Sequence, residues 1–186
     1  MRRVTYSMGM SLDGYIIGPD GRFDWTPLTD EVFRLSLDEI VDVGVHLMGR
    51  RLYETMLYWE TVDPDTLDDL EREWIRRWNP LPKVVFSRTL TEVDGAARLA
   101  TGSVADEIAR LRAEPGEGDI AIGGAELAAE AARDGLIDDY LIRVLPVLVG
   151  GGTPFFARDE REVTLELVET RRFENGVLFV HYRAVR

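Results

Sequence analysis

The sequence predicts one α/β domain in which a mostly parallel sheet carries helices on both faces. Short apolar runs rich in β-branched residues alternate with segments whose apolar residues recur at helical spacing, which is typical of parallel strands joined by helices. The end of the chain differs, because two runs alternate apolar and polar residues around Asn175-Gly176, a pattern that predicts an antiparallel hairpin. At 186 residues, the chain suits a single domain over 1–186.

The composition indicates a folded protein and narrows the classes of function. Apolar residues form 45% of the chain and charged residues 30%, as in ordinary folded domains. There is no cysteine, and the two histidines, His46 and His181, are expected to be structural, so we expect no metal site. We find no signal peptide and no run of about 18 apolar residues, so we expect a cytoplasmic protein without a membrane partner. The net charge of −12 opposes binding to nucleic acid, and an anionic ligand would need a local basic cluster.

The first half of the chain alternates predicted strands and helices. Thr29 suits a helix N-cap, because acidic residues follow it in what would be the first turn. Asp63, directly before Pro64, marks the start of a longer helix with Leu and Trp on its inner face. The predicted elements are a strand over 3–10, a helix from 29 to 41, a strand over 43–48, a helix that follows 49–51, a helix from 64 to 78 and a strand over 83–87.

Residues 120–156 organise the second half. An apolar run ends in Gly123-Gly124 and opens directly into a predicted helix over 125–133, so free backbone N–H groups and the positive helix end would face one spot. A phosphate can bind at such a spot, although a glycine pair after a strand more often forms only a tight turn. Gly135 suits a left-handed helix cap, and a strand over 140–149 runs into the triple glycine 150–152. A helix over 103–112 precedes this unit, and hairpin strands over 163–168 and 176–185 follow it.

Three predicted strand ends carry residues that suit a phosphorylated ligand. They are Gly49-Arg50-Arg51, Ser87-Arg88 and Gly123-Gly124. In an open parallel sheet, ligands lie at the carboxyl ends of the strands, so these segments can reach one crevice. The arginine fork pairs with phosphate oxygens, and a serine hydroxyl adds a donor. We therefore interpret the glycines as contacts of a pyrophosphate and the arginines as contacts of a ribose phosphate, which fits NADPH better than NADH.

The same segments resemble the cofactor motifs of dihydrofolate reductase, namely MGRRLYE at 48–54, VVFSR at 84–88 and IGG at 122–124. The chain is more similar still to the riboflavin-biosynthesis reductase domain, which shares that fold. This similarity includes SLDG at 11–14 and GLIDDY at 135–140, followed by Pro146 and the triple glycine. The resemblance covers nearly the whole chain, so it implies a dihydrofolate reductase-like fold with a mostly parallel sheet, helices on both faces and a C-terminal antiparallel hairpin.

The resemblance also implies a set of cofactor residues. The residues at 49–51 would start a helix near the adenosine 2′-phosphate, with 87–88 beside them, and the glycine pair would approach the pyrophosphate. A cis peptide between those two glycines is a strained form that the resemblance allows. Leu52 departs from the threonine that is usual in dihydrofolate reductase, so backbone N–H groups would have to serve there. The residues assigned to the cofactor are Gly49, Arg50, Arg51, Ser87, Arg88, Gly123, Gly124, Ala125 and Glu126.

The substrate side rests on two aspartates. Asp13 stands in the loop where the riboflavin-type reductases bring the substrate close to the nicotinamide, and the alternative is a turn aspartate bonded to its own backbone. Asp30 follows Trp25 at the spacing at which dihydrofolate reductases place a tryptophan and their substrate-binding carboxylate. Helical spacing puts Asp30 on the buried stripe, where burial would raise its pKa and let it hold or relay a proton. The alternative for Asp30 is a helix-capping residue.

Two further residues are expected at the substrate. Trp25 lies in a loop and is the tryptophan expected to line a pocket. Gly151 lies in the triple glycine, which either lets the backbone approach the substrate closely or forms a strand-end bulge.

These residues predict an NADPH-dependent reductase that transfers a hydride to a small heterocyclic or carbonyl substrate. The resemblance implies a 5-amino-6-(5-phosphoribosylamino)uracil reductase-like or dihydrofolate reductase-like activity, and a homodimer joined through the edge that the hairpin offers. A zinc deaminase domain usually accompanies the uracil reductase. We do not expect one in this sequence, because it contains neither an H-x-E nor a P-C-x-x-C motif. The alternatives are a non-catalytic nucleotide-binding or regulatory domain with a retained cofactor groove, and a flavin-binding oxidoreductase. A pocket at Asp13, Trp25 and Asp30 that opens onto the nicotinamide would favour the enzyme.

Overall fold

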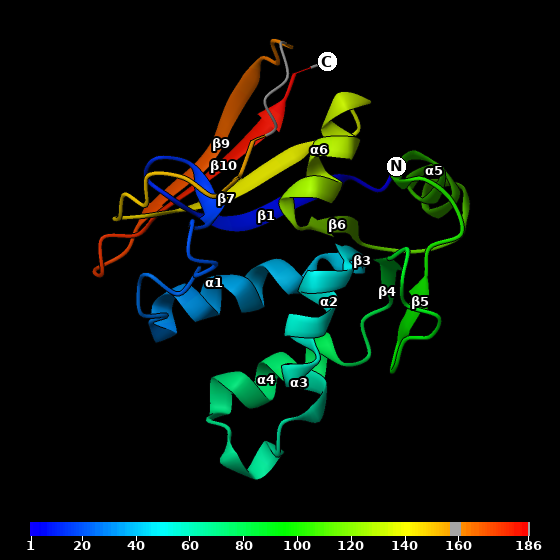
Figure 1. Ribbon diagram of the computed structural model, residues 1–186, viewed down its shortest axis with the longest axis horizontal. Helices are drawn as coiled ribbons and strands as arrows, with labels where there is room; N and C mark the ends of the chain where they lie inside the picture. The colour runs from blue at the N-terminus through cyan, green and yellow to red at the C-terminus, as the bar shows by residue number, and fades with distance from the viewer. Residues whose placement is uncertain (157–160, 186) are drawn as a thin grey trace.

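A computed structural model describes residues 1–156 and 161–185, and it shows an eight-stranded sheet with helices on both faces (Figure 1). The strand order is β5-β4-β3-β6-β1-β7-β10-β9. The six strands from β5 to β7 along this order pair parallel with their neighbours. β10 then pairs antiparallel with β7 on one side and with β9 on the other. The strands are β1 (Val4–Ser11), β3 (Val43–Gly49), β4 (Lys83–Phe86), β5 (Ala97–Leu99), β6 (Asp119–Gly123), β7 (Asp139–Leu145), β9 (Leu165–Arg172) and β10 (Leu178–Ala184).

The helices form one layer on each face of the sheet. In the view of Figure 1, α5 (Val104–Ala113) and α6 (Ala125–Arg133) lie above the sheet. On the other face lie α1 (Asp30–Val41), α2 (Arg50–Met56), α3 (Tyr58–Thr61) and α4 (Asp69–Trp78). A small second sheet pairs β2 (Tyr15–Ile17) with β8 (Thr153–Pro154), and this pair joins the loops that follow β1 and β7.

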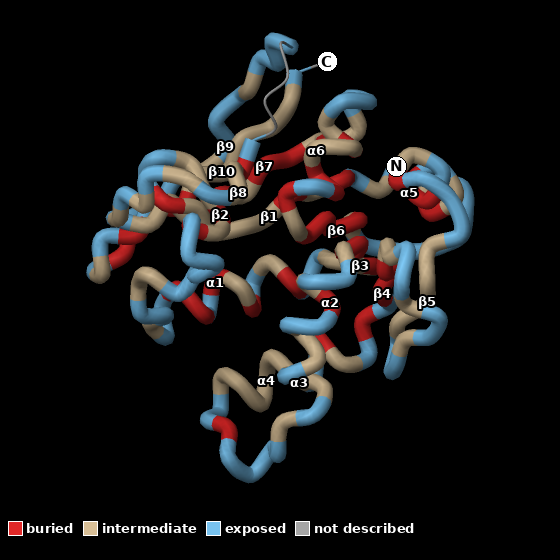
Figure 2. Tube along the Cα trace, in the orientation of Figure 1, coloured by how far each residue is buried: buried red, intermediate tan, exposed pale blue. Residues whose placement is uncertain are grey.

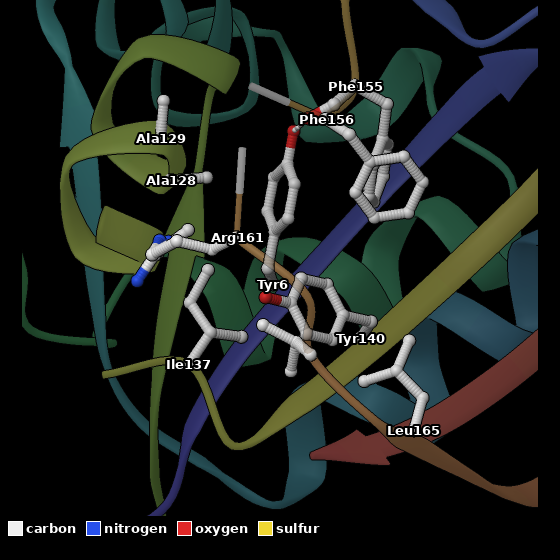
Figure 3. Close-up of a pocket in the computed structure, with 11 residues that line it drawn as sticks. Tyr6, Ala128, Ala129, Ile137, Tyr140, Phe155, Phe156, Arg161 and Leu165 are labelled. Atoms are coloured by element: carbon white, nitrogen blue, oxygen red, sulfur yellow. Dashed lines mark hydrogen bonds between the residues drawn. The ribbon is translucent and has the colours of Figure 1, made fainter. Parts of the chain in front are cut away.

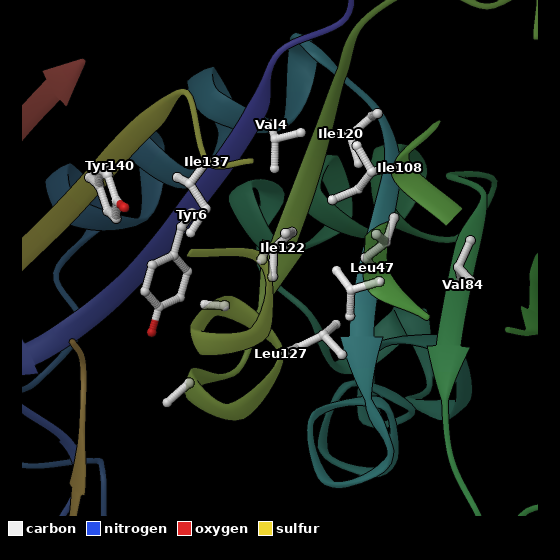
Figure 4. Packing of buried hydrophobic residues seen from close by; sticks show 14 of the residues in the cluster. Val4, Tyr6, Leu47, Val84, Ile108, Ile120, Ile122, Leu127, Ile137 and Tyr140 are labelled. Atoms are coloured by element: carbon white, nitrogen blue, oxygen red, sulfur yellow. The ribbon is translucent and has the colours of Figure 1, made fainter. Parts of the chain in front are cut away.

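The alternation of side chains along the central strands sends apolar groups to both faces. Leu47 and Ile122 pack with α5 and α6, whereas their neighbour Met48 packs with α2 and α4. Figure 2 shows that the buried segments gather along the central strands, and Figure 4 shows the side chains of β1, β3 and β6 packed against Leu127 of α6. Two core layers of this kind fix which face each strand residue occupies.

The predicted fold class and the C-terminal hairpin are confirmed. β9 and β10 pair antiparallel, and β10 pairs with β7, so the hairpin forms one edge of the sheet. Its turn spans 173–177, with hydrogen bonds from the Phe173 N–H to the Val177 carbonyl and from the Gly176 N–H to the Phe173 carbonyl. Gly176 has a φ of 83°, which a glycine adopts at little cost.

Some element boundaries differ from the prediction. The helix predicted from 64 to 78 is instead a 3-10 turn, η1 (Pro64–Thr66), followed by α4. The carboxylate of Asp68 accepts from the Glu71 N–H and the carboxylate of Glu71 accepts from the Asp68 N–H, so this reciprocal cap starts a new helix. The strand predicted over 140–149 ends at Leu145, because Pro146 has no N–H to donate. None of the described helices is long and apolar enough to span a membrane.

Candidate functional site

The three predicted ligand segments emerge side by side at the carboxyl ends of β4, β3 and β6. Gly49 pairs with Phe86 across β3 and β4, and Met48 pairs with Gly123 across β3 and β6. The segments 49–51, 87–88 and 123–126 therefore leave three adjacent parallel strands at one edge of the sheet. This arrangement satisfies the geometric condition for one shared ligand crevice.

The two glycines of the pair meet different needs. An added Cβ on Gly123 would overlap the Leu52 side chain and lie 2.8 Å from Cε1 of His46, so close packing requires glycine there. Gly124 is the N-cap of α6 with a φ of 95°, and a Cβ built on it meets nothing within 4 Å. This backbone conformation favours glycine, and the space in front of it is open. All peptide bonds of the described residues are trans, so the cis peptide that the resemblance allowed is not present.

The helix residues after the glycine pair offer backbone rather than side-chain contacts. Ala125 is buried, and Glu126 is exposed in the first turn of α6. The first N–H groups of a helix have no partner within the helix, so those of 124–126 are available to an anion. The Glu126 carboxylate itself would repel an anion, so its contribution is limited to its backbone N–H.

The basic residues at this edge differ in their availability. Arg50 forms an ion pair with Glu54 at 3.4 Å, one helical turn further on. Arg51 and Arg88 are exposed, and no described residue forms a side-chain hydrogen bond or ion pair with either guanidinium. Ser87 Oγ accepts from the N–H groups of Thr89 at 3.1 Å and Leu90 at 3.0 Å, so Ser87 shapes its own turn. The free cations of the predicted set are therefore Arg51 and Arg88.

Asp13 holds two loops together. Its carboxylate accepts from the N–H of Val149 at 3.1 Å and from the N–H of Gly150 at 2.7 Å, so the loop after β1 is tied to the loop after β7. A hydrogen bond with the Ser11 hydroxyl is the largest of the effects that lower the pKa of Asp13, and the two backbone N–H groups lower it further. An ionised, tethered carboxylate suits positioning of the loops better than donation of a proton. Gly151 lies in the same tied loop, where a Cβ would contact Pro19 at 3.6 Å.

Asp30 is not buried, and the expectation that it lies on the buried stripe of its helix is wrong. Its side chain is 75% exposed and lies 3.9 Å from the guanidinium of Arg34. The physical reason is position, since Thr29 caps α1 and makes Asp30 its first residue, with no preceding turn to cover it. The buried face of α1 begins at Val32 and Phe33. Trp25 is half-buried in the loop before α1, and neither it nor Asp13 nor Asp30 lines the two cavities described below, so the pocket at these three residues that would favour the enzyme is not found there.

The larger cavity is a groove of about 440 Å³ between the sheet and α1, and the motif analysis missed it. Its floor includes Ser7 of β1 and Arg143 of β7, and further walls come from α2, α4 and His46. Leu52 and His46, which line the groove, are also the side chains that pack on Gly123. The groove therefore ends beside the glycine pair, on the α1 side of the sheet.

A polar network spans the groove from β7 to α1. The Arg143 guanidinium donates to Ser7 Oγ at 3.0 Å, to Ser36 Oγ at 3.2 Å and to Glu39 Oε2 at 2.8 Å. Ser7 in turn donates to Glu39 Oε2 at 2.8 Å. Arg143 Nε and Glu39 Oε1 are buried without a hydrogen-bonding partner among the described residues. Charged and polar residues inside strands that should be apolar were the signal for this site.

Comparison with known proteins identifies the family of the chain. The RibD C-terminal domain family matches residues 2–179. The chain belongs to the RibD C-terminal domain family. YyaP, an uncharacterized protein of Bacillus subtilis (strain 168), is 30% identical over 182 residues, which are 97% of this chain and 94% of YyaP.

Solved structures support the RibD C-terminal domain fold. A crystal structure of a Shewanella sp. PV-4 protein named for riboflavin biosynthesis matches with a TM-score of 0.77 at 25% identity, over 100% of both chains. The diaminohydroxyphosphoribosylaminopyrimidine deaminase/5-amino-6-(5-phosphoribosylamino)uracil reductase of Thermotoga maritima matches with a TM-score of 0.67 at 17% identity, over 99% of this chain and 57% of that one. The predicted family and its reductase-like fold are therefore confirmed.

His46 contributes a neutral ring to the groove of this RibD C-terminal domain. Burial lowers its pKa to about 4, and the nearby Lys83 ammonium adds to the effect. The ring packs edge-on against Trp78 at 5.5 Å between ring centroids. At neutral pH, His46 is therefore uncharged. His181 Nε2 forms a hydrogen bond with Asp139 Oδ1 at 2.7 Å, as a structural residue would.

The second cavity lies on the opposite face of the sheet. It has a volume of about 250 Å³ and is bounded by α6 and the aromatic side chains of Tyr6, Tyr140, Phe155 and Phe156 (Figure 3). Tyr6 donates a hydrogen bond to the Phe155 carbonyl at 3.3 Å, and burial raises its pKa. Because the sheet separates this cavity from the groove, we exclude it from the candidate site.

We predict that Gly124→Ala destabilises the fold more than Gly49→Ala. Both glycines are helix N-caps with open space around a built Cβ, but Gly124 has a φ of 95° and Gly49 a φ of −75°. The unfavourable conformation should lower the free energy of unfolding by about 1–3 kcal/mol more for Gly124→Ala. Urea denaturation measures both variants. If the two variants lost the same free energy of unfolding, the positive φ of Gly124 would not be the cause of the difference we expect.

We predict that Asp13→Ala releases the loop after β7. The amide protons of Val149 and Gly150 should exchange faster with solvent, because they lose their acceptor. In the native protein, the tie is complete above the ordinary aspartate pKa of about 3.9 and is lost only as the pH falls through the lowered pKa of Asp13. Amide chemical shifts of Val149 and Gly150 against pH measure this midpoint.

The control for Asp13→Ala is Asp20→Ala, since the Asp20 carboxylate accepts from the Arg22 N–H within its own turn. This variant should leave the Val149 and Gly150 amides unchanged. If the amide shifts of the native protein had a pH midpoint at or above the ordinary aspartate pKa, the hydrogen bonds from Val149 and Gly150 to Asp13 would be contradicted.

Proposed function

We propose that this protein is a single-domain NADPH-dependent reductase that transfers a hydride to a small heterocyclic or carbonyl substrate. The observation that carries the proposal is the alignment of three ligand segments at neighbouring strand ends in a member of the RibD C-terminal domain family. The name of the Thermotoga maritima relative includes a reductase activity, and this supports the same class of chemistry here.

The residues at the strand ends fit a phosphorylated dinucleotide. The backbone N–H groups of 124–126 and the open space at Gly124 suit a pyrophosphate. The free guanidinium groups of Arg51 and Arg88 suit the 2′-phosphate that distinguishes NADPH from NADH. NADPH held by these groups would supply the hydride that reduces a C=O or C=N bond, with the balancing proton taken from water.

The groove beside Gly123 suits the substrate. Leu52 and His46 belong both to the groove and to the packing around Gly123, so a substrate in the groove would lie next to a cofactor at the glycine pair. Positioning of the two reactants is the main task of the protein in such a reaction. In this proposal, Asp13 holds the loops after β1 and β7 in place, because its lowered pKa makes it a poor proton donor.

We predict that NADPH binds more tightly than NADH by about tenfold or more, as expected for about 1.5–3 kcal/mol from charge-assisted hydrogen bonds. Arg51→Ala and Arg88→Ala should each weaken NADPH binding by about tenfold and leave NADH binding nearly unchanged. Titration of cofactor fluorescence with the purified protein measures both ligands.

Arg172→Ala is the matched control, because Arg172 is an exposed arginine on the distant edge strand β9. It should change neither affinity by more than about twofold, as for an ordinary surface substitution. Absence of NADPH binding to the native protein would exclude the proposed reductase. Binding without turnover of any heterocyclic or carbonyl substrate would favour the nucleotide-binding alternative.

A further inference from the structure

The groove between the sheet and α1 is predominantly acidic. Among the described residues that line it, six are Asp or Glu and three are Arg. The acidic residues are Asp38, Glu39, Asp42, Asp119, Asp139 and Glu169, and the arginines are Arg3, Arg143 and Arg171. A bound group in the groove therefore meets an excess of negative charge.

Each arginine of the groove already has a carboxylate partner. Arg143 pairs with Glu39 at 2.8 Å and Arg3 with Asp139 at 3.6 Å. Arg171 pairs with Glu169. Because these cations are neutralised inside the groove, a phosphate placed there would gain little attraction and would lose its hydration. Arg51 and Arg88 at the strand ends differ, because they have no such partner among the described residues.

The pKa of Asp119, one of these groove carboxyls, is raised. Burial is the main cause that raises the pKa of Asp119, and the carboxylates of Asp139 and Asp42 raise it further. The Arg3 N–H and the Arg3 charge act in the opposite direction without cancelling the shift. An added anion in this part of the groove would meet the same penalty of burial.

The Arg143–Glu39 pair leaves one hydrogen-bond donor and one acceptor without a partner among the described residues. Arg143 Nε is a donor and Glu39 Oε1 an acceptor, and both are buried without a described partner. A buried polar atom without a partner costs about 1–3 kcal/mol. The side chains of Arg143 and Glu39 line the groove and are 13% and 16% exposed, whereas Arg143 Nε and Glu39 Oε1 are themselves covered, so a group in the groove would reach them only after a movement of these side chains. An uncharged group with one acceptor and one donor complements this pair.

We propose that the substrate group that enters this groove carries no phosphate and no carboxylate, and that the Arg143–Glu39 pair selects for an uncharged hydrogen-bonding ring or carbonyl compound. This inference rests on the proposed function, because it takes the groove as the substrate pocket. It separates this protein from the phosphoribosyl substrate that the name of the Thermotoga maritima relative states. Glu39 is the specificity-determining residue, since it neutralises Arg143.

The test titrates inorganic phosphate into the NADPH-saturated protein at constant ionic strength. The indole N–H signals of Trp74 and Trp78, both of which line the groove, report binding there in nitrogen-15 spectra. The native protein should show no saturable shift of either signal. Glu39→Gln should give a saturable shift with affinity raised about tenfold or more, because removal of one nearby negative charge leaves Arg143 free to pair with phosphate. Glu114→Gln, at an exposed position after α5, should behave like the native protein.

Two outcomes overturn the inference. One is a saturable phosphate shift in the native protein that Arg143→Ala removes, and the other is a folded Glu39→Gln variant with no gain in phosphate binding. If Glu39→Gln does not fold, the native titration decides alone. Failure of the proposed function is read separately, from the absence of NADPH binding when the sample is prepared, and the phosphate titration then proceeds on the protein without cofactor.

Discussion

The parallel register of β4, β3 and β6 is the constraint on which the candidate site depends. The ladders place Gly49 beside Phe86 and Met48 beside Gly123, so three loops leave the sheet at one level. Packing on both faces holds this register, because a slip of one residue would turn Leu47 and Ile122 away from α6 and α5. The position of every proposed cofactor contact therefore follows from the core, and the loops need to supply only the conformation of Gly124 and the free arginines.

The two faces of the sheet have different relations to the site. The α5 and α6 side carries an apolar core that includes Val4, Ile120 and Ala131, with the aromatic cavity at its edge. The α1 side places charged groups, led by Glu39 and Arg143, between the helix and the strands, where a groove remains. A buried ion pair contributes little net stability compared with apolar packing, so the Arg143–Glu39 pair adds little to the stability of this face. One face maintains the scaffold, and the other is available for a substrate.

Many of the elements could be predicted from the sequence because their signals are local, and the cofactor contacts remain a prediction. The glycine pair, the helix that follows it and the Asn175-Gly176 turn are each encoded within a few residues. The burial of Asp30 could not be judged from helical spacing, because its exposure depends on its being the first residue of α1. The groove was missed for a related reason, since Ser7, Glu39 and Arg143 come from three elements and meet only after folding.

The shared dinucleotide site is tested most directly by an NADPH titration followed by backbone amide chemical shifts in nitrogen-15 spectra. We expect saturable shifts of the amides in the three segments 49–51, 87–88 and 123–126 with one common dissociation constant, because one ligand would touch all three strand ends. Shifts confined to one segment, or centred on the aromatic cavity beside α6, would contradict a shared dinucleotide site at the carboxyl ends of β4, β3 and β6.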